Sequence, residues 1–163
     1  MWFNALALVA SATILSACGG SDAGSGDTST PAPGTPPTGG APPAAVAPAP
    51  ITGTTHTVNM VGDDKGYRFE PATINIKAGD GIKFVSVSGP PHNVGFNPAG
   101  IPDDVEPQLD ANMLEKMLPL EGKMLNIIGE SVTISFGNIK PGSYRVHCTP
   151  HTPMNMYGTI VVQ

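Results

Sequence analysis

Apolar and polar residues alternate in short runs through the last two thirds of the chain. These runs cover residues 55–61, 73–77, 81–87, 94–96, 131–136, 143–147 and 157–162. Alternation with a period of two, in runs rich in β-branched and aromatic residues, is typical of half-buried β-strands. Turn-forming residues separate several of them, as at 78–80 and 138–142. About seven short strands joined in this way predict an all-β fold, an antiparallel Greek-key β-sandwich.

One stretch follows a different period. Between residues 108 and 118 the apolar residues recur at helical spacing, and Pro119 comes directly after them. This pattern predicts one short helical insertion that ends before the proline. We expect its apolar face to cover an edge of the sandwich. The apolar residues are Leu109, Met113, Leu114, Met117 and Leu118.

The first residues have the pattern of a targeting segment. The apolar run 5–15 is too short to span a membrane, and a signal peptide has a run of this length. The following Leu15-Ser16-Ala17-Cys18 resembles a bacterial lipobox, although the first four residues include no Lys or Arg. We predict a lipoprotein signal peptide over residues 1–17 and a lipid on Cys18. An uncleaved anchor, or an unmodified Cys18, is the alternative.

Residues 18–52 are expected to form a disordered linker behind the lipidated Cys18. Pro, Gly, Ala, Ser and Thr make up nearly all of this segment, so it cannot bury a hydrophobic core. The folded domain is therefore predicted over residues 53–163. The net charge of −5 argues against a nucleic-acid partner, which requires a basic face. We expect a monomer at the extracytoplasmic face of the cell envelope, attached to the membrane through Cys18.

The last two predicted strands enclose the residues with the most specific chemistry. The loop between them carries Cys148, His151, Met154 and Met156, with prolines that stiffen it. Thiolate, imidazole and thioether ligands together suit copper, and two His, one Cys and a weak axial Met form the blue-copper pattern. The second His must come from elsewhere in the chain, and His92 is the candidate. At this point either methionine fits the axial position.

The chain from about residue 54 onward resembles a cupredoxin, close to plastocyanin and closer still to pseudoazurin. The resemblance implies one type 1 copper held by His92, Cys148, His151 and Met156. It also implies that Asn93 bridges the His92 segment to the Cys148 loop. His147 is a departure, since an aromatic or apolar residue often precedes the Cys, and the Met-rich stretch is longer than in plastocyanin. The motifs that carry the resemblance are His92-Asn93-Val94, Ile101-Pro102-Asp103, Pro141-Gly142-x-Tyr144 and Cys148-Thr149-Pro150-His151-x-x-Met154-x-Met156-x-Gly158.

This resemblance implies a mononuclear blue copper protein, not an enzyme, that shuttles single electrons between redox proteins in the periplasm or at the cell envelope. Partners of such proteins are c-type cytochromes, copper reductases and photosynthetic or respiratory complexes. The alternative is a copper delivery or storage protein that binds labile metal. A multicopper oxidase is not indicated, because Thr149 follows Cys148 and the chain contains no His-x-His pair.

Three further features have two interpretations each. Met113, Met117 and Met124 either fill space in the core or form a secondary Cu(I) site. His147 should point away from the metal, since neighbours in a strand face opposite sides, but it is also a candidate second exit for the electron. The acidic residues Asp103, Asp104 and Glu106 either steer a basic partner or form an ordinary solvated turn.

Overall fold

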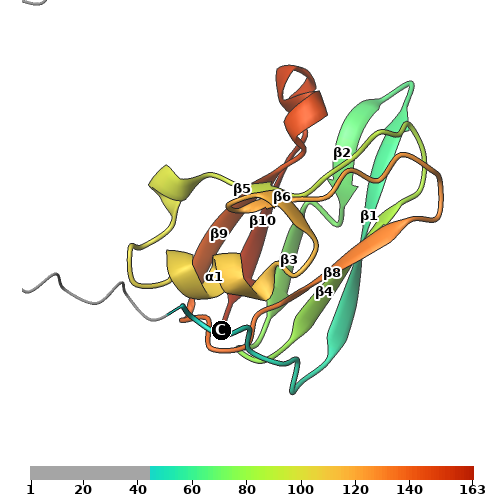
Figure 1. Ribbon diagram of the computed structural model, residues 1–163. Coiled ribbons are helices and arrows are strands. Elements are labelled where there is room, and N and C mark those ends of the chain that lie inside the picture. Colours follow the sequence, from blue (N-terminus) through green and yellow to red (C-terminus); the bar gives the residue numbers. More distant parts are fainter. Residues whose placement is uncertain (1–44) are drawn as a thin grey trace, which may run out of the picture. The chain divides into compact units, whose positions relative to one another are not determined.

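The computed structural model describes residues 45–163, which form two facing β-sheets and one short α-helix (Figure 1). The predicted all-β sandwich with a helical insertion is confirmed. The predicted signal peptide, the lipidated Cys18 and most of the linker lie outside the described residues. Within residues 45–163, no helix is both long enough and apolar enough to cross a membrane.

The first sheet has four strands in the order β2-β1-β4-β8, and the second has six in the order β3-β10-β9-β5-β7-β6. Two neighbouring pairs, β1 with β4 and β3 with β10, run parallel, so the sandwich is not antiparallel throughout. The strands of the first sheet are β1 (Thr55–Asp63), β2 (Gly66–Glu70), β4 (Gly81–Ser86) and β8 (Ser131–Ser135). Those of the second are β3 (Thr73–Ile76), β5 (Gly95–Phe96), β6 (Lys116–Leu118), β7 (Glu121–Gly122), β9 (Gly142–His147) and β10 (Tyr157–Val162).

Alternation along the strands produces the core between the sheets. In β8, Val132 and Ile134 are buried while Thr133 is exposed, and β4 buries Phe84 in the same way. Period-two side chains leave a strand on opposite faces, so one face of each strand supplies the core. Phe84 meets Phe69 of β2 edge to face, with ring centroids 6.0 Å apart. This aromatic contact lies within the core of apolar side chains between the strands.

The helical insertion is shorter than predicted and begins earlier. Helix α1 spans Glu106–Asn112, and the chain then forms strand β6, where the prediction placed the second half of the helix. Leu109 and Met113 are buried, as the helical spacing implied. The other three apolar residues of the predicted helix are instead exposed: Leu114, Met117 and Leu118.

The end of α1 is determined by a tertiary interaction that periodicity does not reveal. The Asn112 side-chain amide donates to the backbone oxygens of Ser135 (3.0 Å) and Gly137 (2.9 Å). These two buried hydrogen bonds tie the last helical residue to the end of β8. Met113 then leaves the helical region, with ψ at 79°, and the chain turns toward the second sheet.

The segment before β1 belongs to the domain, although it was predicted as the end of the linker. Ala49 is buried, and its backbone N–H donates to the Asn112 side-chain oxygen (2.8 Å). The backbone N–H groups of Thr52 and Gly53 both donate to the Gly79 oxygen at 2.9 Å. The domain therefore begins several residues before the predicted boundary at residue 53. Pattern alone missed this because the segment has no strand alternation.

Candidate metal centre

The loop between β9 and β10 is held in a compact conformation by hydrogen bonds within its own backbone. Short 3₁₀ helix η2 (Thr149–Met154) occupies most of it and stands at one end of the sandwich in Figure 1. The Cys148 N–H donates to the Met156 oxygen, and the Met156 N–H donates to the His151 oxygen, both at 3.1 Å. Asn155 adopts a left-handed conformation (φ 61°) that closes the turn. Backbone bonds thus fix three of the predicted ligand residues relative to one another.

Three donor atoms converge beside this loop. The Cys148 sulfur lies 3.4 Å from His151 Nδ1 and 3.6 Å from His92 Nδ1. All three side chains are buried, and the three atoms lie within 4.8 Å of one another. Metal–nitrogen and metal–sulfur bonds of roughly 2.1 and 2.3 Å at tetrahedral angles separate the donors by about 3.6 Å. The observed spacing therefore fits a single ion of that size.

His92 is oriented by hydrogen bonds on both its backbone and its ring. Its backbone pairs with Leu125 through two hydrogen bonds of 2.7 and 2.9 Å. Ring atom Nε2 lies 2.8 Å from the Ser88 carbonyl oxygen. A carbonyl only accepts, so Nε2 carries the hydrogen and Nδ1 presents its lone pair toward Cys148. A carbonyl partner of this kind is typical of metal-binding histidines.

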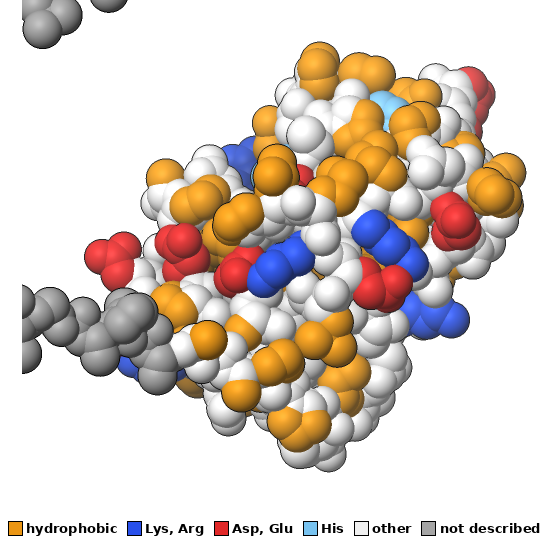
Figure 2. Space-filling view, viewed as in Figure 1, with side chains coloured by type: hydrophobic (Ala, Val, Ile, Leu, Met, Phe, Trp, Pro, Cys, Tyr) orange, Lys and Arg blue, Asp and Glu red, His pale blue; other side chains and the backbone are white. Residues whose placement is uncertain are grey.

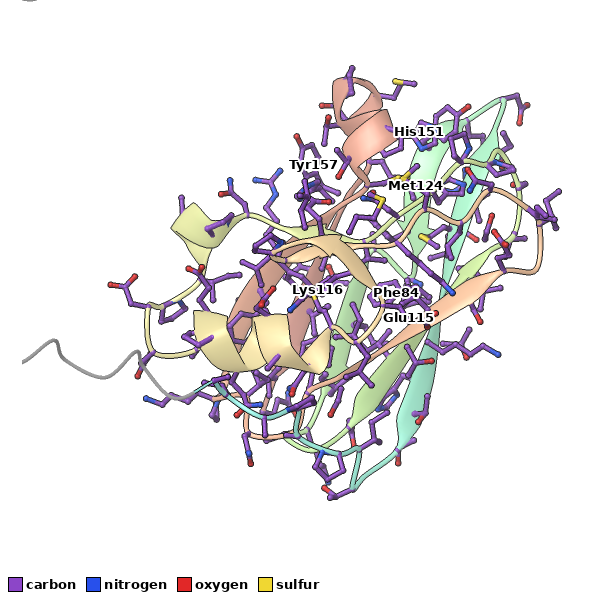
Figure 3. The ribbon with its side chains drawn as sticks, viewed as in Figure 1. Phe84, Glu115, Lys116, Met124, His151 and Tyr157 are labelled. Atoms are coloured by element: carbon purple, nitrogen blue, oxygen red, sulfur yellow. The ribbon has the colours of Figure 1, made fainter. Side chains whose placement is uncertain are left out.

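His151 is held by a ring stack. Its imidazole lies parallel to the ring of Tyr67, with centroids 3.7 Å apart and an angle of 18° between the planes. Tyr67 comes from β2, a strand that sequence analysis missed. The alternation of Tyr67 and Phe69 with polar residues was a signal that was available to find it. Figure 3 shows the His151 side chain at the end of the sandwich that carries η2.

The electrostatic environment favours a metal over free protonated ligands. Burial lowers the pKa of both His92 and His151, which favours the neutral imidazoles that a metal requires. Burial also raises the pKa of the Cys148 thiol, while the Asn93 N–H, 3.5 Å from the sulfur, acts in the opposite direction. A buried thiolate therefore needs a cation beside it, which a bound metal ion provides.

Asn93 links the two segments that carry the donors, as the sequence resemblance implied. Its side-chain oxygen accepts from the Thr149 N–H (2.7 Å), and its amide nitrogen donates to the Thr149 hydroxyl (3.1 Å). The same nitrogen donates to a carboxylate oxygen of Glu121 (3.0 Å). These bonds join the residue after His92 to the residue after Cys148. They keep the sulfur and the first imidazole at a fixed separation.

The methionines differ in their surroundings. The Met156 side chain is fully buried, whereas Met154 is 48% exposed. Met113 lies in the core and Met117 is half exposed, so packing accounts for Met113 and the hypothesis of a secondary Cu(I) site gains no support. Met117 and Met124 instead line an apolar depression beside Pro150. Figure 2 shows hydrophobic side chains gathered on the same end of the molecule as η2.

Comparison with known proteins agrees with this geometry. Residues 56–163 match the copper binding proteins of the plastocyanin/azurin family. Plastocyanin from Nostoc punctiforme is 38% identical over 111 residues, which are 67% of this chain and 74% of that protein. The oxidized form of plastocyanin from Dryopteris crassirhizoma is 33% identical with a TM-score of 0.50, covering 66% of this chain and 99% of that one.

A pseudoazurin structure shows a similar likeness at lower identity. Native pseudoazurin from Hyphomicrobium denitrificans is 27% identical to this chain, with a TM-score of 0.48. The match covers 66% of this chain and 74% of that one.

Proposed function

Because the chain belongs to the plastocyanin/azurin family of copper-binding proteins, we propose that it carries single electrons between redox proteins through one type 1 copper ion. The observation that carries this proposal is the convergence of His92, Cys148 and His151 in a buried, hydrogen-bonded frame. Copper, when bound, supplies a one-electron couple between Cu(I) and Cu(II). All three donor residues are buried, and we propose no enzymatic activity.

The four ligands in this proposal are His92, Cys148, His151 and Met156. The first three fit a single ion by the spacing of their donor atoms. For the axial position, the full burial of Met156 supports it over Met154, which is half exposed to solvent. The backbone of Met156 is also hydrogen-bonded to both Cys148 and His151, which brings it to the same site.

The chain contributes to electron transfer by keeping the geometry of the ligands the same in both oxidation states of the ion. The Ser88 carbonyl orients the His92 ring, the Tyr67 ring supports His151, and Asn93 ties the Cys148 loop to the His92 segment. None of these contacts depends on the charge of the ion. A site held from outside in this way has little to rearrange when an electron arrives or leaves, and a small rearrangement favours rapid transfer.

Spectroscopy and voltammetry on the full chain test this function. We expect the protein with one equivalent of Cu(II) to show the intense visible band of blue copper proteins and a reversible one-electron wave. A copper delivery or storage protein, the alternative function, would instead bind copper without this band and release it readily to a chelator. Cys148→Ala is the matched control, since it removes the thiolate that gives the band.

We propose that the protein works outside the cytoplasm, in the periplasm or on the cell envelope, with a lipid on Cys18 holding it to the membrane. The lipobox-like residues 15–18 support this, although Cys18 lies outside the described residues. Mass spectrometry of the mature N-terminus tests it directly: a diacylated Cys18 is expected. A mature protein that retains residues 1–17, or begins elsewhere, would contradict it. Cys18→Ser should move the protein from the membrane fraction to the soluble fraction.

The proposed partners are redox proteins, namely a c-type cytochrome, a copper reductase or a photosynthetic or respiratory complex. We propose that they dock on the end of the sandwich formed by residues 89–91 and 150–153. Neither segment contains a charged side chain, and the depression beside Pro150 extends this apolar surface. A small apolar contact suits brief encounters of low affinity. In this proposal the protein itself is a monomer.

A further inference from the structure

A single carboxylate connects three residues around the proposed sulfur ligand. One oxygen of Glu121 accepts from His147 Nε2 at 3.0 Å. The other oxygen accepts from the Thr149 hydroxyl (2.7 Å) and from the Asn93 amide (3.0 Å). His147 and Thr149 are the two sequence neighbours of Cys148, and Asn93 follows His92. Glu121 therefore contacts both sides of the sulfur ligand and the segment of the first imidazole.

The backbone leaves room for this arrangement. A Cβ atom at Gly95 would lie 2.6 Å from His147 Nε2 and 2.6 and 2.7 Å from the two Glu121 oxygens. Real Cβ atoms do not approach other atoms so closely, so a side chain at position 95 would have to displace the ends of the Glu121 and His147 side chains. Gly95 lies opposite both Glu121 and His147 in the second sheet. The pair is largely buried, with side-chain exposures of 21% and 15%.

We propose that Glu121 is a positioning residue, which fixes the backbone on both sides of Cys148 and favours the oxidised state of the copper through its negative charge. The inference deepens the proposed function and rests on it. Charge-assisted hydrogen bonds of this kind are stronger than neutral ones, so one carboxylate holds three donors firmly. A negative charge near the site stabilises the more positive ion, which lowers the reduction potential.

The first test separates charge from hydrogen bonding in the copper-loaded protein. Glu121→Gln removes the charge and keeps the size of the side chain. We expect it to raise the reduction potential by about 59 mV, which is a tenfold change in a one-electron equilibrium. Glu121→Ala also removes the hydrogen bonds and should in addition alter the visible and electron paramagnetic resonance spectra. The matched control is Glu115→Gln, because Glu115 is exposed and its carboxylate pairs with Lys123, away from the three donors.

A second pair of variants tests the geometry without changing the charge. Gly95→Ala places a methyl group against the carboxylate and should alter the spectra as Glu121→Ala does. Gly100→Ala is the control, since a Cβ there has no neighbour within 4 Å among residues 45–163, and it should behave as the wild type. The proposal is overturned if Glu121→Ala and Gly95→Ala match their controls in potential and spectra.

A third measurement needs no copper and keeps the two proposals separable. In the copper-free full chain, we expect Glu121→Ala to lower the melting temperature by roughly 4 to 8 °C more than Glu115→Ala does, because it removes the three hydrogen bonds. Faster exchange of the Thr149 amide hydrogen should accompany this change. If the wild type with copper shows no blue band, the proposed function is refuted, and so is the effect of Glu121 on the reduction potential. Exchange of the Thr149 amide hydrogen in the copper-free chain still tests the positioning role. Unchanged Thr149 exchange in Glu121→Ala would overturn that role.

Discussion

The ring of Tyr67 and the imidazole of His151 are stacked at a centroid distance of 3.7 Å, which joins the first sheet to the loop of the metal site. Two glycines make room for the tyrosine ring. A Cβ at Gly62 would lie 2.5 Å from Tyr67 Cε1, and one at Gly89 would lie 3.1 Å from it. The stack therefore depends on both the first sheet and the segment leading to His92. It positions a proposed ligand that has no other ring contact from the first sheet.

We expect Tyr67→Leu to retain copper and to alter the visible spectrum, because the His151 ring loses the surface that orients it. The free energy of unfolding of the copper-free protein should fall by about 1 to 2 kcal/mol, from lost stacking and lost packing. Tyr67→Phe keeps the stack and serves as the control. Identical spectra for Tyr67→Leu and wild type would show that the loop alone orients His151.

The axial ligand is tested by a pair of methionine variants. Met156→Leu should keep copper bound and raise the reduction potential, on the order of 59 mV, because removal of the thioether takes a donor away from the oxidised ion. Met154→Leu should leave the potential unchanged, since that side chain is half exposed. Voltammetry of both variants decides the assignment. The reverse result would make Met154 the axial ligand.

Copper should stabilise the fold, because the ligand geometry exists only in the folded chain. At a free copper concentration of 100 times the dissociation constant, the expected gain is about 2.7 kcal/mol. Calorimetry should show a higher melting temperature with copper and a return to the lower value after a chelator removes it. Cys148→Ala should lose most of this gain, whereas His56→Gln, remote from the site, should keep it. Equal gains for all three proteins would place the stabilising copper elsewhere.

Acid should destabilise the domain through Asp80, which lies outside the metal site. Its carboxylate accepts from the backbone N–H groups of Lys77 and Thr54 and from the His56 ring. These bonds, first the one from Lys77, lower the pKa of Asp80 from 3.8 to about 2. A depressed pKa gives stability that is present above pH 4 and is lost as the pH falls from about 4 toward 2.

Urea unfolding of the copper-free protein at several pH values measures this effect. Asp80→Asn should cost about 1.5 to 3 kcal/mol at neutral pH and should flatten the dependence on pH between 4 and 2. Asp64→Asn, at an exposed position, is the control and should follow the wild-type curve. An unchanged acid slope in Asp80→Asn would assign the acid sensitivity to other carboxylates.

A triple variant tests whether negative charge steers a basic partner to the protein. It replaces the acidic residues Asp103, Asp104 and Glu106. Asp104 already pairs with Lys140, which lowers the pKa of Asp104 and offsets its charge. If steering operates, the rate of electron transfer to a basic cytochrome should fall as salt rises. The variant with Asn, Asn and Gln at these positions should start roughly tenfold lower and barely change with salt. Coincident curves would leave only the apolar end as the docking surface.

Much of the architecture could be predicted from local pattern. The alternation around Val132 and Ile134 gave a strand in nearly the observed place, and the loop from Cys148 to Met156 was located by its residue types. The end of α1 could not be predicted, because it depends on bonds from Asn112 to Ser135 and Gly137, more than 20 residues away. The helical spacing of apolar residues therefore extends to Leu118, although the chain leaves the helix after Asn112.

The same limit applies to the metal centre. The chemistry of its donors is local in the sequence, so three of them could be recognised within one loop. The residues that orient them come from distant segments: Tyr67 from β2 and Glu121 from β7. A tyrosine or glutamate in a short polar run has no pattern that marks such a contact. Only the pairing of the strands brings these side chains to the site.

Residues 49–53 lie at the end of the domain that is farthest from the proposed metal ligands. This segment is bonded to Gly79, and the neighbouring Ala78 N–H bonds to the C-terminal Gln163. These residues lie at the Gly142 and Val162 ends of β9 and β10, whereas Cys148 lies beyond the opposite ends. Each of these strands has six residues, which separate the two ends of the domain by roughly 17 to 20 Å. Residues 49–53 therefore lie at the end of the domain opposite the proposed copper site, and a membrane anchor joined to the domain through them would leave that site accessible to a partner.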